Sequence, residues 1–149
     1  MVCVSHVLIV GASLAGLRAA ESLRNNGFTG TITAVGNETR GLYDRPPLSK
    51  KFLAGEWDAD RIALRKAEEI SALNVEWRFG TTATKLDIAA RTLSTDKGDI
   101  SYDACIIATG GDVRRLPNQP NIAGVQVLRT IDDAEALRDA LAPDENLVV

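Results

Sequence analysis

Histidine and cysteine are scarce in this sequence of 149 residues, which contains one His and two Cys. The two cysteines, Cys3 and Cys105, form no C-x-x-C pair and no other metal-ligand spacing, and we interpret them as small hydrophobic residues of buried strands. His6 lies in an apolar segment and is interpreted as a packed or surface residue. These shortages argue against a zinc site and against a thiol–histidine nucleophile, and no metal site is predicted.

Long apolar runs and clusters of basic residues are absent as well. No segment approaches the roughly 18 apolar residues that a membrane helix needs, and no Lys or Arg precedes the first apolar run, so neither a membrane span nor a secretion signal is predicted. The 17 basic residues are scattered and the formal charge is -3, which argues against nucleic acid and anionic membranes as partners. With 45% hydrophobic and 25% charged residues, the composition is typical of one globular domain, which we expect in the cytoplasm.

The first 35 residues predict a strand, a helix and a second strand. The β-branched run from His6 to Val10 ends at Gly11 and is typical of a parallel strand buried on both faces. Apolar residues at helical spacing predict a helix from Leu14 to Asn26, with Gly27 available as its cap. Thr31 to Val35 alternates and is β-branched, which predicts a second strand, parallel to the first after a right-handed crossover.

The remaining sequence predicts a mixture of elements. Gly, Pro, Asn and Asp are frequent between Gly36 and Pro47, which indicates a long loop. The fold class is therefore α/β, with a parallel sheet whose first strand lies between the second and third, plus a small antiparallel meander. The further predicted elements are a short helix near Leu48 to Leu53, a helix from Arg65 to Leu73, an extended segment from Val75 to Phe79, the meander from Thr82 to Tyr102, the third core strand from Ala104 to Ala108, and a helix ending at Leu141 that Thr130 and Asp133 cap.

The motif Gly11-Ala12-Ser13-Leu14-Ala15-Gly16 is a dinucleotide-binding fingerprint in which Ser13 replaces the second glycine. It follows a strand and opens a helix, whose amino terminus offers N–H groups to a pyrophosphate. Glu38 lies 22 residues after Gly16, beyond the next strand, where a carboxylate can hold ribose hydroxyls. The alternative is an ordinary turn rich in small residues. The fingerprint by itself does not separate FAD from NAD, because both contain adenosine and pyrophosphate.

The segment Leu42-Tyr43-Asp44-Arg45-Pro46-Pro47-Leu48-Ser49-Lys50, followed by Leu53-Ala54-Gly55, resembles the segment along the flavin in bacterial ferredoxin reductases of the putidaredoxin reductase type. The resemblance covers essentially all 149 residues, including Ala108-Thr109-Gly110-Gly111 and the segment from Leu128 to Ala134. It implies a Rossmann-like FAD-binding domain, and electron transfer from NAD(P)H through FAD to a [2Fe-2S] ferredoxin that serves a P450 or a ring-hydroxylating oxygenase. A disulfide reductase is a poor alternative, because no cysteine lies near this segment.

The resemblance also implies roles for individual residues. Ala15 is expected to contact the pyrophosphate, and Asn37 stands where relatives often have an acid, so the ribose contact is expected to pass to Glu38. Lys50 is expected beside the flavin ring as the catalytic residue, where an ammonium stabilises negative charge on reduction; a solvated surface lysine is the alternative. Ala83 is expected to offer backbone to adenine. The predicted cofactor-binding set is Gly11, Ser13, Leu14, Ala15, Gly16, Asn37, Glu38, Arg45, Pro46, Lys50, Ala83, Thr109, Gly110 and Arg129.

By the same resemblance, residues 1–113 form the first segment of an FAD-binding domain, residues 114–145 a connecting segment with a helix, and residues 146–149 the start of the first strand of an NAD(P)H-binding domain. We expect the fold to be incomplete at its carboxyl end, because in the family a later segment supplies a fourth parallel strand and an acid near the ribityl chain. The alternative function is therefore a non-catalytic fragment that binds FAD or an adenine nucleotide weakly and associates through an open sheet edge.

Overall fold

The computed structural model describes residues 4–115, 117–118, 122 and 124–141. The described residues form two compact units, one within residues 1–43 and 64–110 and the other within residues 44–63 and 111–149. Cys3 and the strand predicted at residues 146–149 lie outside the described residues. The domain boundaries predicted at residues 113 and 145 stay predictions.

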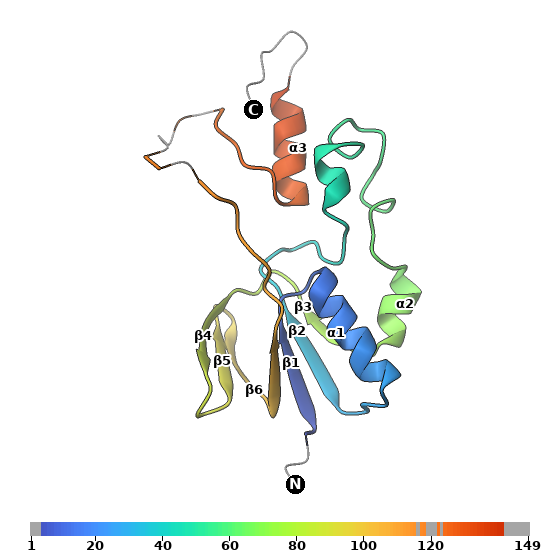
Figure 1. The fold of residues 1–149 in the computed structure, drawn as a ribbon, viewed down its shortest axis with the longest axis vertical. Coiled ribbons are helices and arrows are strands. Elements are labelled where there is room, and N and C mark those ends of the chain that lie inside the picture. The colour runs from blue at the N-terminus through green and yellow to red at the C-terminus, as the bar shows by residue number, and fades with distance from the viewer. Residues whose placement is uncertain (1–3, 116, 119–121, 123, 142–149) are drawn as a thin grey trace. The chain divides into compact units, whose positions relative to one another are not determined.

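The first unit is built on a four-stranded parallel sheet in the order β3-β2-β1-β7 (Figure 1). Its central strand β1 pairs Val10 with Val35 on one side and with Ile107 on the other. The predicted α/β class and the predicted position of the first strand are therefore confirmed. The strands are β1 (His6–Val10), β2 (Thr31–Val35), β3 (Glu76–Arg78) and β7 (Ala104–Ile107). The fourth strand of this sheet is β3, from the segment predicted to be extended, and not a later segment as the resemblance implies.

Alternating side chains bury the sheet on both faces. Ile9 of β1 packs in one cluster with Ala20 of α1 (Leu14–Asn25). Its neighbour Leu8 packs in another cluster with Leu93 of the meander. Figure 1 shows α1 on one side of the sheet and the meander on the other. Since Leu8 and Ile9 are both fully buried, the prediction of a strand covered on both faces is confirmed.

The meander occupies the position that the sequence predicts. Its strands pair antiparallel in the order β4-β5-β6, and short turns join them. Leu93 and Ile100 turn from it toward the parallel sheet and are buried. The meander therefore adds a third layer to the first unit. Its strands are β4 (Ala83–Asp87), β5 (Thr92–Thr95) and β6 (Gly98–Ser101).

Helix α1 ends in a Schellman motif. Gly27 has a φ of 83°, a conformation that glycine adopts without a Cβ clash. The Phe28 N–H donates to the Leu23 carbonyl oxygen at 3.0 Å, and the Gly27 N–H donates to the Arg24 carbonyl oxygen at 3.0 Å. The prediction of Gly27 as the cap of this helix is confirmed.

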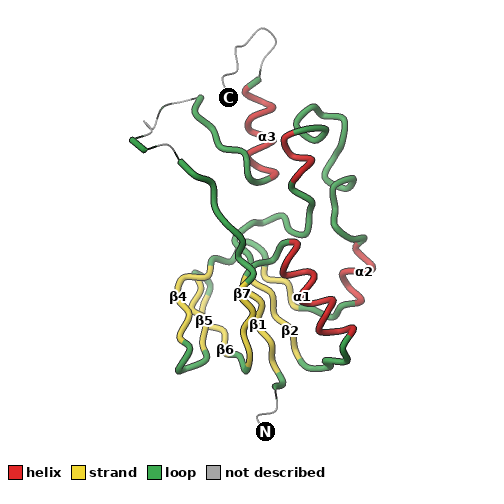
Figure 2. Tube along the Cα trace, viewed as in Figure 1, coloured by secondary structure: helices red, strands yellow, loops and turns green. Residues whose placement is uncertain are grey.

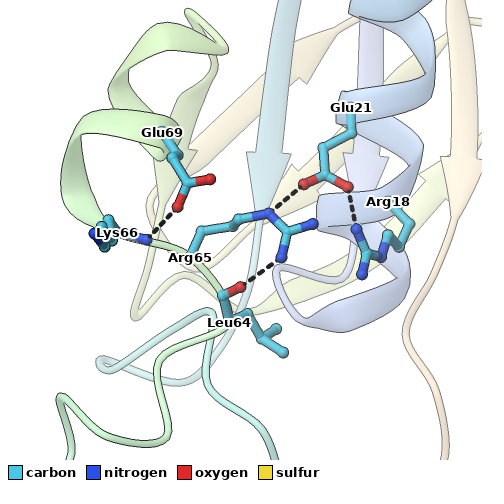
Figure 3. Close-up of polar contacts among 6 residues, drawn as sticks. All are labelled: Arg18, Glu21, Leu64, Arg65, Lys66 and Glu69. Carbon is cyan, nitrogen blue, oxygen red and sulfur yellow. Dashed lines mark hydrogen bonds and ion pairs between the residues drawn. The ribbon is translucent and has the colours of Figure 1, made fainter.

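Helix α2 (Ala67–Ala72) begins two residues later than predicted, and Arg65, which precedes it, contacts α1. The Arg65 Nε donates to Glu21 Oε1 at 2.9 Å, and Arg18 Nη1 donates to Glu21 Oε2 at 2.6 Å (Figure 3). The hydrogen bond from Arg18 is the main cause that holds the pKa of Glu21 below its ordinary value, and burial opposes it. Glu69 caps the amino terminus of α2, because its carboxylate accepts from the Lys66 N–H at 3.0 Å.

The second unit contains the short 3-10 helix η1 (Pro46–Ser49) and the helix α3 (Ile131–Ala140). The helix predicted near Leu48 to Leu53 is wrong in position and type. Two prolines suit the first positions of a helix, where no N–H is needed, so the turn begins at Pro46. It ends at Lys50, whose φ of -132° and ψ of -113° are not helical, and a loop follows (Figure 2).

The cap of α3 is the one that the sequence predicts. Thr130 Oγ1 accepts from the Asp133 N–H at 3.1 Å, and Asp133 Oδ2 accepts from the Thr130 N–H at 2.8 Å. The Arg129 N–H also donates to Asp133 Oδ2, at 2.9 Å. Burial raises the pKa of the Asp133 carboxyl, but these hydrogen bonds outweigh it and hold the pKa below its ordinary value. Within the part of the chain that the structure describes, no helix is long and apolar enough to span a membrane.

Hydrogen bonds to Asp103 join the start of β1 to the loop between β6 and β7. Its Oδ2 accepts from the Ser5 hydroxyl at 2.7 Å, the Ser5 N–H at 2.8 Å and the His6 N–H at 2.9 Å. The Ser5 hydroxyl is the largest of the causes that lower the pKa of Asp103 to about 2. Three donors on one oxygen stabilise the charged carboxylate.

Replacement of Asp103 by asparagine is expected to flatten the acid limb of the stability profile. The folded pKa of about 2 lies below the unfolded value of about 3.9, so the contribution of Asp103 is complete above about pH 5 and is lost as the pH falls toward 2. Thermal melts between pH 7 and pH 2 should show a lower melting temperature for the variant at neutral pH and a shallower decline below about pH 4. Asp99→Asn, at an exposed position of β6, is the matched control, and a profile for Asp103→Asn parallel to the unmodified one would contradict the assignment.

Candidate functional site

The glycine turn after β1 lies where the carboxyl ends of β1, β2 and β7 meet. The Gly11 N–H donates to the Val35 carbonyl oxygen at 2.8 Å, and the Ala108 N–H donates to the Val10 carbonyl oxygen at 2.7 Å. Gly11 has a φ of 123°, and a Cβ at this position would lie 2.1 Å from the Ala108 carbonyl oxygen. Both the backbone conformation and the lack of space therefore require glycine here.

The start of α1 approaches this turn just as closely. A Cβ on Gly16 would lie 1.9 Å from the carbonyl oxygen of Gly11. A Cβ on Gly36, directly after β2, would lie 2.7 Å from the Cβ of Ala12. The start of α1 thus packs directly on the backbone of the turn, as the first and last glycines of the fingerprint predict, and the segment after β2 packs against the methyl group of Ala12.

The amino terminus of α1 is suited to an anion. Ser13 is the N-cap with an extended backbone, and within the described residues its side chain makes no capping hydrogen bond. The first turn contains no acidic residue, and Leu14 and Ala15 are exposed. The first N–H groups of an α-helix have no acceptor in the helix and carry partial positive charge. These N–H groups fit a pyrophosphate.

The segment after β2 contains the two residues predicted to bind the ribose, and they lie in different surroundings. Asn37 is exposed. Glu38 is half-buried, its carbonyl oxygen accepts from the Gly80 N–H at 2.8 Å, and its carboxylate accepts from the Tyr43 hydroxyl. The Glu38 carboxylate is therefore held by a neighbour, whereas Asn37 is presented to solvent.

Three more residues of the predicted cofactor-binding set belong to the first unit. Thr109 and Gly110 follow β7 and are exposed, and a Cβ on Gly11 would lie 2.9 Å from the Thr109 nitrogen. The turn after β7 therefore adjoins the turn after β1. Ala83 is exposed at the start of β4, on the meander.

The four other predicted residues belong to the second unit. Arg45 Nη1 donates to the Arg129 carbonyl oxygen at 2.7 Å, so these two residues lie together. Pro46 begins η1 and is exposed. Lys50 is exposed as well, with its Nζ 3.3 Å from the Pro46 carbonyl oxygen and 3.4 Å from Ser49 Oγ.

The sequence-based set omits two residues that shape this site. Gly36 allows the close contact with Ala12, and a glycine directly after a predicted strand is a signal that could have identified it. Tyr43 belongs to the motif on which the resemblance rests, but it received no role there. Its contact with Glu38 depends on the path of the intervening loop, which the sequence does not reveal.

Comparison with known proteins places these features in a family context. A family model described as pyridine nucleotide-disulphide oxidoreductase matches residues 5–149. Rhodocoxin reductase of Rhodococcus erythropolis is 40% identical over 145 residues, which cover 96% of this chain and 34% of that protein. The ferredoxin--NAD(+) reductase component of the biphenyl dioxygenase system of Paraburkholderia xenovorans is 38% identical over 148 residues, covering 98% and 36%.

The structural comparison agrees. The crystal structure of the covalent putidaredoxin reductase-putidaredoxin complex matches with a TM-score of 0.83 and 35% identity, over 94% of this chain and 35% of that one. The predicted resemblance to ferredoxin reductases of this type is therefore confirmed. The chain spans about a third of the length of these relatives.

Proposed function

Because the chain belongs to the pyridine nucleotide-disulphide oxidoreductase family, we propose that the protein containing it is the reductase component of an oxygenase system. In this role it transfers electrons from NAD(P)H through FAD to a [2Fe-2S] ferredoxin, which serves a P450 or a ring-hydroxylating oxygenase. The similarity to rhodocoxin reductase and to the reductase component of a biphenyl dioxygenase system supports this proposal. A cytoplasmic location stays a prediction.

The glycine turn is the observation that carries the proposal. Gly11 lets the turn pack against the backbone at Ala108, and Gly16 lets α1 pack against the turn. This packing holds the first N–H groups of α1 at the carboxyl end of β1, where a pyrophosphate can bind. Bound FAD would supply the conversion of a two-electron hydride into single-electron transfers, which a ferredoxin acceptor requires. The protein's own contribution at this turn is to bind and orient the dinucleotide.

The roles of the remaining residues are part of the same proposal. Asn37 and Glu38 would form hydrogen bonds with the ribose hydroxyls. Lys50 would supply positive charge beside the flavin ring. The exposed ammonium of Lys50 supports that role, because an exposed side chain can turn toward a ligand with little rearrangement. The other residues proposed to bind the cofactor are Ser13, Leu14, Ala15, Arg45, Pro46, Ala83, Thr109, Gly110 and Arg129.

The proposal is tested with the full-length protein that contains this chain. After reconstitution with FAD and gel filtration, we expect the visible absorption of oxidised flavin, its bleaching by NADH or NADPH, and reduction of an added [2Fe-2S] ferredoxin. Comparison of the two nicotinamide cofactors then identifies the preferred donor. A protein that retains no flavin, or whose bound flavin neither cofactor reduces, would refute the proposed function.

For the 149-residue chain by itself we expect no NAD(P)H-dependent ferredoxin reduction, even with excess FAD. The chain spans about a third of its relatives' length, and its one fingerprint is already assigned to FAD. The presence of this one fingerprint also supports a second candidate function for the chain alone, namely weak binding of FAD or an adenine nucleotide without catalysis. Turnover comparable to that of the full-length protein in a ferricyanide assay would contradict this expectation.

Self-association of the isolated chain is part of the same proposal. Among the strands that the structure describes, β7 is the last in the sheet order on its side, and Ile107 is 68% exposed there. An unpaired strand edge next to an exposed apolar side chain favours association. Sedimentation velocity over a concentration series should show dimers or larger species for the unmodified chain and fewer for Ile107→Lys.

A further inference from the structure

The Tyr43 hydroxyl makes a directed contact with Glu38. The Tyr43 side chain is only 5% exposed, and its hydroxyl donates to Glu38 Oε2. A buried tyrosine hydroxyl needs a hydrogen-bond partner, and a bond to a carboxylate is stronger than one between neutral groups. The contact therefore fixes where the Glu38 carboxylate lies after β2.

Backbone contacts hold Tyr43 in place. The preceding Leu42 has a φ of 61°, which a non-glycine residue rarely adopts, and its side chain is buried. The Leu42 carbonyl oxygen accepts from the Leu64 N–H at 2.7 Å. Because surrounding structure must maintain an unfavourable backbone conformation, the pairing with Leu64 helps to hold the backbone next to Tyr43 in place.

Helix α1 anchors this pairing through one arginine. Arg65 Nη1 donates to the Leu64 carbonyl oxygen at 2.8 Å, while its Nε donates to Glu21 Oε1 at 2.9 Å (Figure 3). Glu21 lies on the same helix whose amino terminus forms the anion site. A continuous series of contacts therefore joins α1 to the Glu38 carboxylate, and all of it lies in the first unit.

We propose that Tyr43 is a positioning residue for cofactor binding: it orients Glu38 toward the ribose hydroxyls of the adenosine part of FAD. The Glu21–Arg65 pair is the anchor that sets this orientation relative to α1. This inference rests on the proposed function. An ionised carboxylate accepts about four hydrogen bonds, so Glu38 can accept from Tyr43 and from ribose hydroxyls together. In this proposal Tyr43 acts through Glu38.

The test measures preference for ribose hydroxyls rather than activity. The full-length protein is stripped of flavin, and calorimetry compares the affinity for ADP with that for 2′,3′-dideoxy-ADP, which lacks both hydroxyls. We expect the unmodified protein to prefer ADP by roughly tenfold, as a hydrogen bond to a charged group implies, and Tyr43→Phe to lose most of that preference. Glu38→Gln should lose it too, and the double variant should be no worse than Glu38→Gln.

Tyr102→Phe is the matched control, because it removes another buried tyrosine hydroxyl from the first unit, one that lies 3.4 Å from the Asp87 carbonyl oxygen. We expect it to leave the ribose preference unchanged. A merely structural role of Tyr43 would weaken both nucleotides equally, and an unchanged ratio in Tyr43→Phe would overturn the inference.

Glu38→Gln keeps an acceptor for the Tyr43 hydroxyl and provides a second test if Tyr43→Phe folds poorly. An unchanged ratio in Glu38→Gln would overturn the inference as well. Failure of the unmodified protein to bind FAD or ADP at all would instead refute the proposed function. The two failures are therefore distinguishable.

Discussion

Replacement of Gly11 by valine is expected to abolish flavin retention by the full-length protein and to destabilise the first unit by at least about 3 kcal/mol. The φ of 123° is unfavourable for any residue with a Cβ and most of all for a β-branched one. The added Cβ would also lie 2.1 Å from the Ala108 carbonyl oxygen, which belongs to backbone and has little freedom to move. Relief of this clash must separate the turn from β7 and so disturb the backbone that would bind the pyrophosphate.

The measurement is flavin absorption per protein after gel filtration, together with urea denaturation. Gly27→Val is the matched control, since Gly27 also has a positive φ, of 83°, but no atom within 4 Å of its would-be Cβ. We expect that variant to lose about 1–2 kcal/mol from backbone conformation and to retain its flavin. Full flavin occupancy in Gly11→Val would refute the assignment of this turn.

Truncation of Ile9 to alanine is expected to lower the free energy of unfolding by about 2–5 kcal/mol. Ile9 lies on the central strand, is fully buried, and packs in the cluster that joins the sheet to α1. The smaller side chain leaves a cavity that β2 and β7 on either side cannot easily close, because both are hydrogen-bonded to β1.

Urea denaturation gives the free energy of unfolding of Ile9→Ala and Ile88→Ala, the same substitution at a buried and at an exposed position. Ile88 is 78% exposed, at the turn after β4, and its truncation should alter the free energy of unfolding by no more than about 0.5 kcal/mol. Equal losses in the two variants would contradict the burial that the structure shows.

The elements that the sequence predicts well are those with strong local signals. The apolar run from His6 to Val10, the helical spacing up to Gly27 and the Thr130–Asp133 cap each combine a side-chain pattern with a residue that ends or begins the element. The glycine fingerprint is equally local, because Gly11 and Gly16 are required by backbone packing within a single strand-turn-helix unit.

Several features that depend on partners distant in the sequence were not predicted. The extended segment around Trp77 joins the parallel sheet as β3, but three residues are too few to show which strand they pair with. Arg65 leaves the predicted helix for Glu21, which lies 44 residues away in the chain. Leucine carries no signal for a positive φ, so the conformation of Leu42, and with it the contact of Tyr43, could not be inferred.

The position of β1 between β2 and β7 also constrains how the first unit folds. Ser5 and Asp103, which meet beside β1, are 98 residues apart, whereas β1, α1 and β2 are contiguous. Closing so long a loop is slow, because the chain loses conformational entropy before the stabilising contacts between its ends can form. During synthesis the strand–helix–strand unit can therefore assemble first, with one edge of β1 unpaired until β7 emerges. That interval is when the nascent chain is most exposed to aggregation.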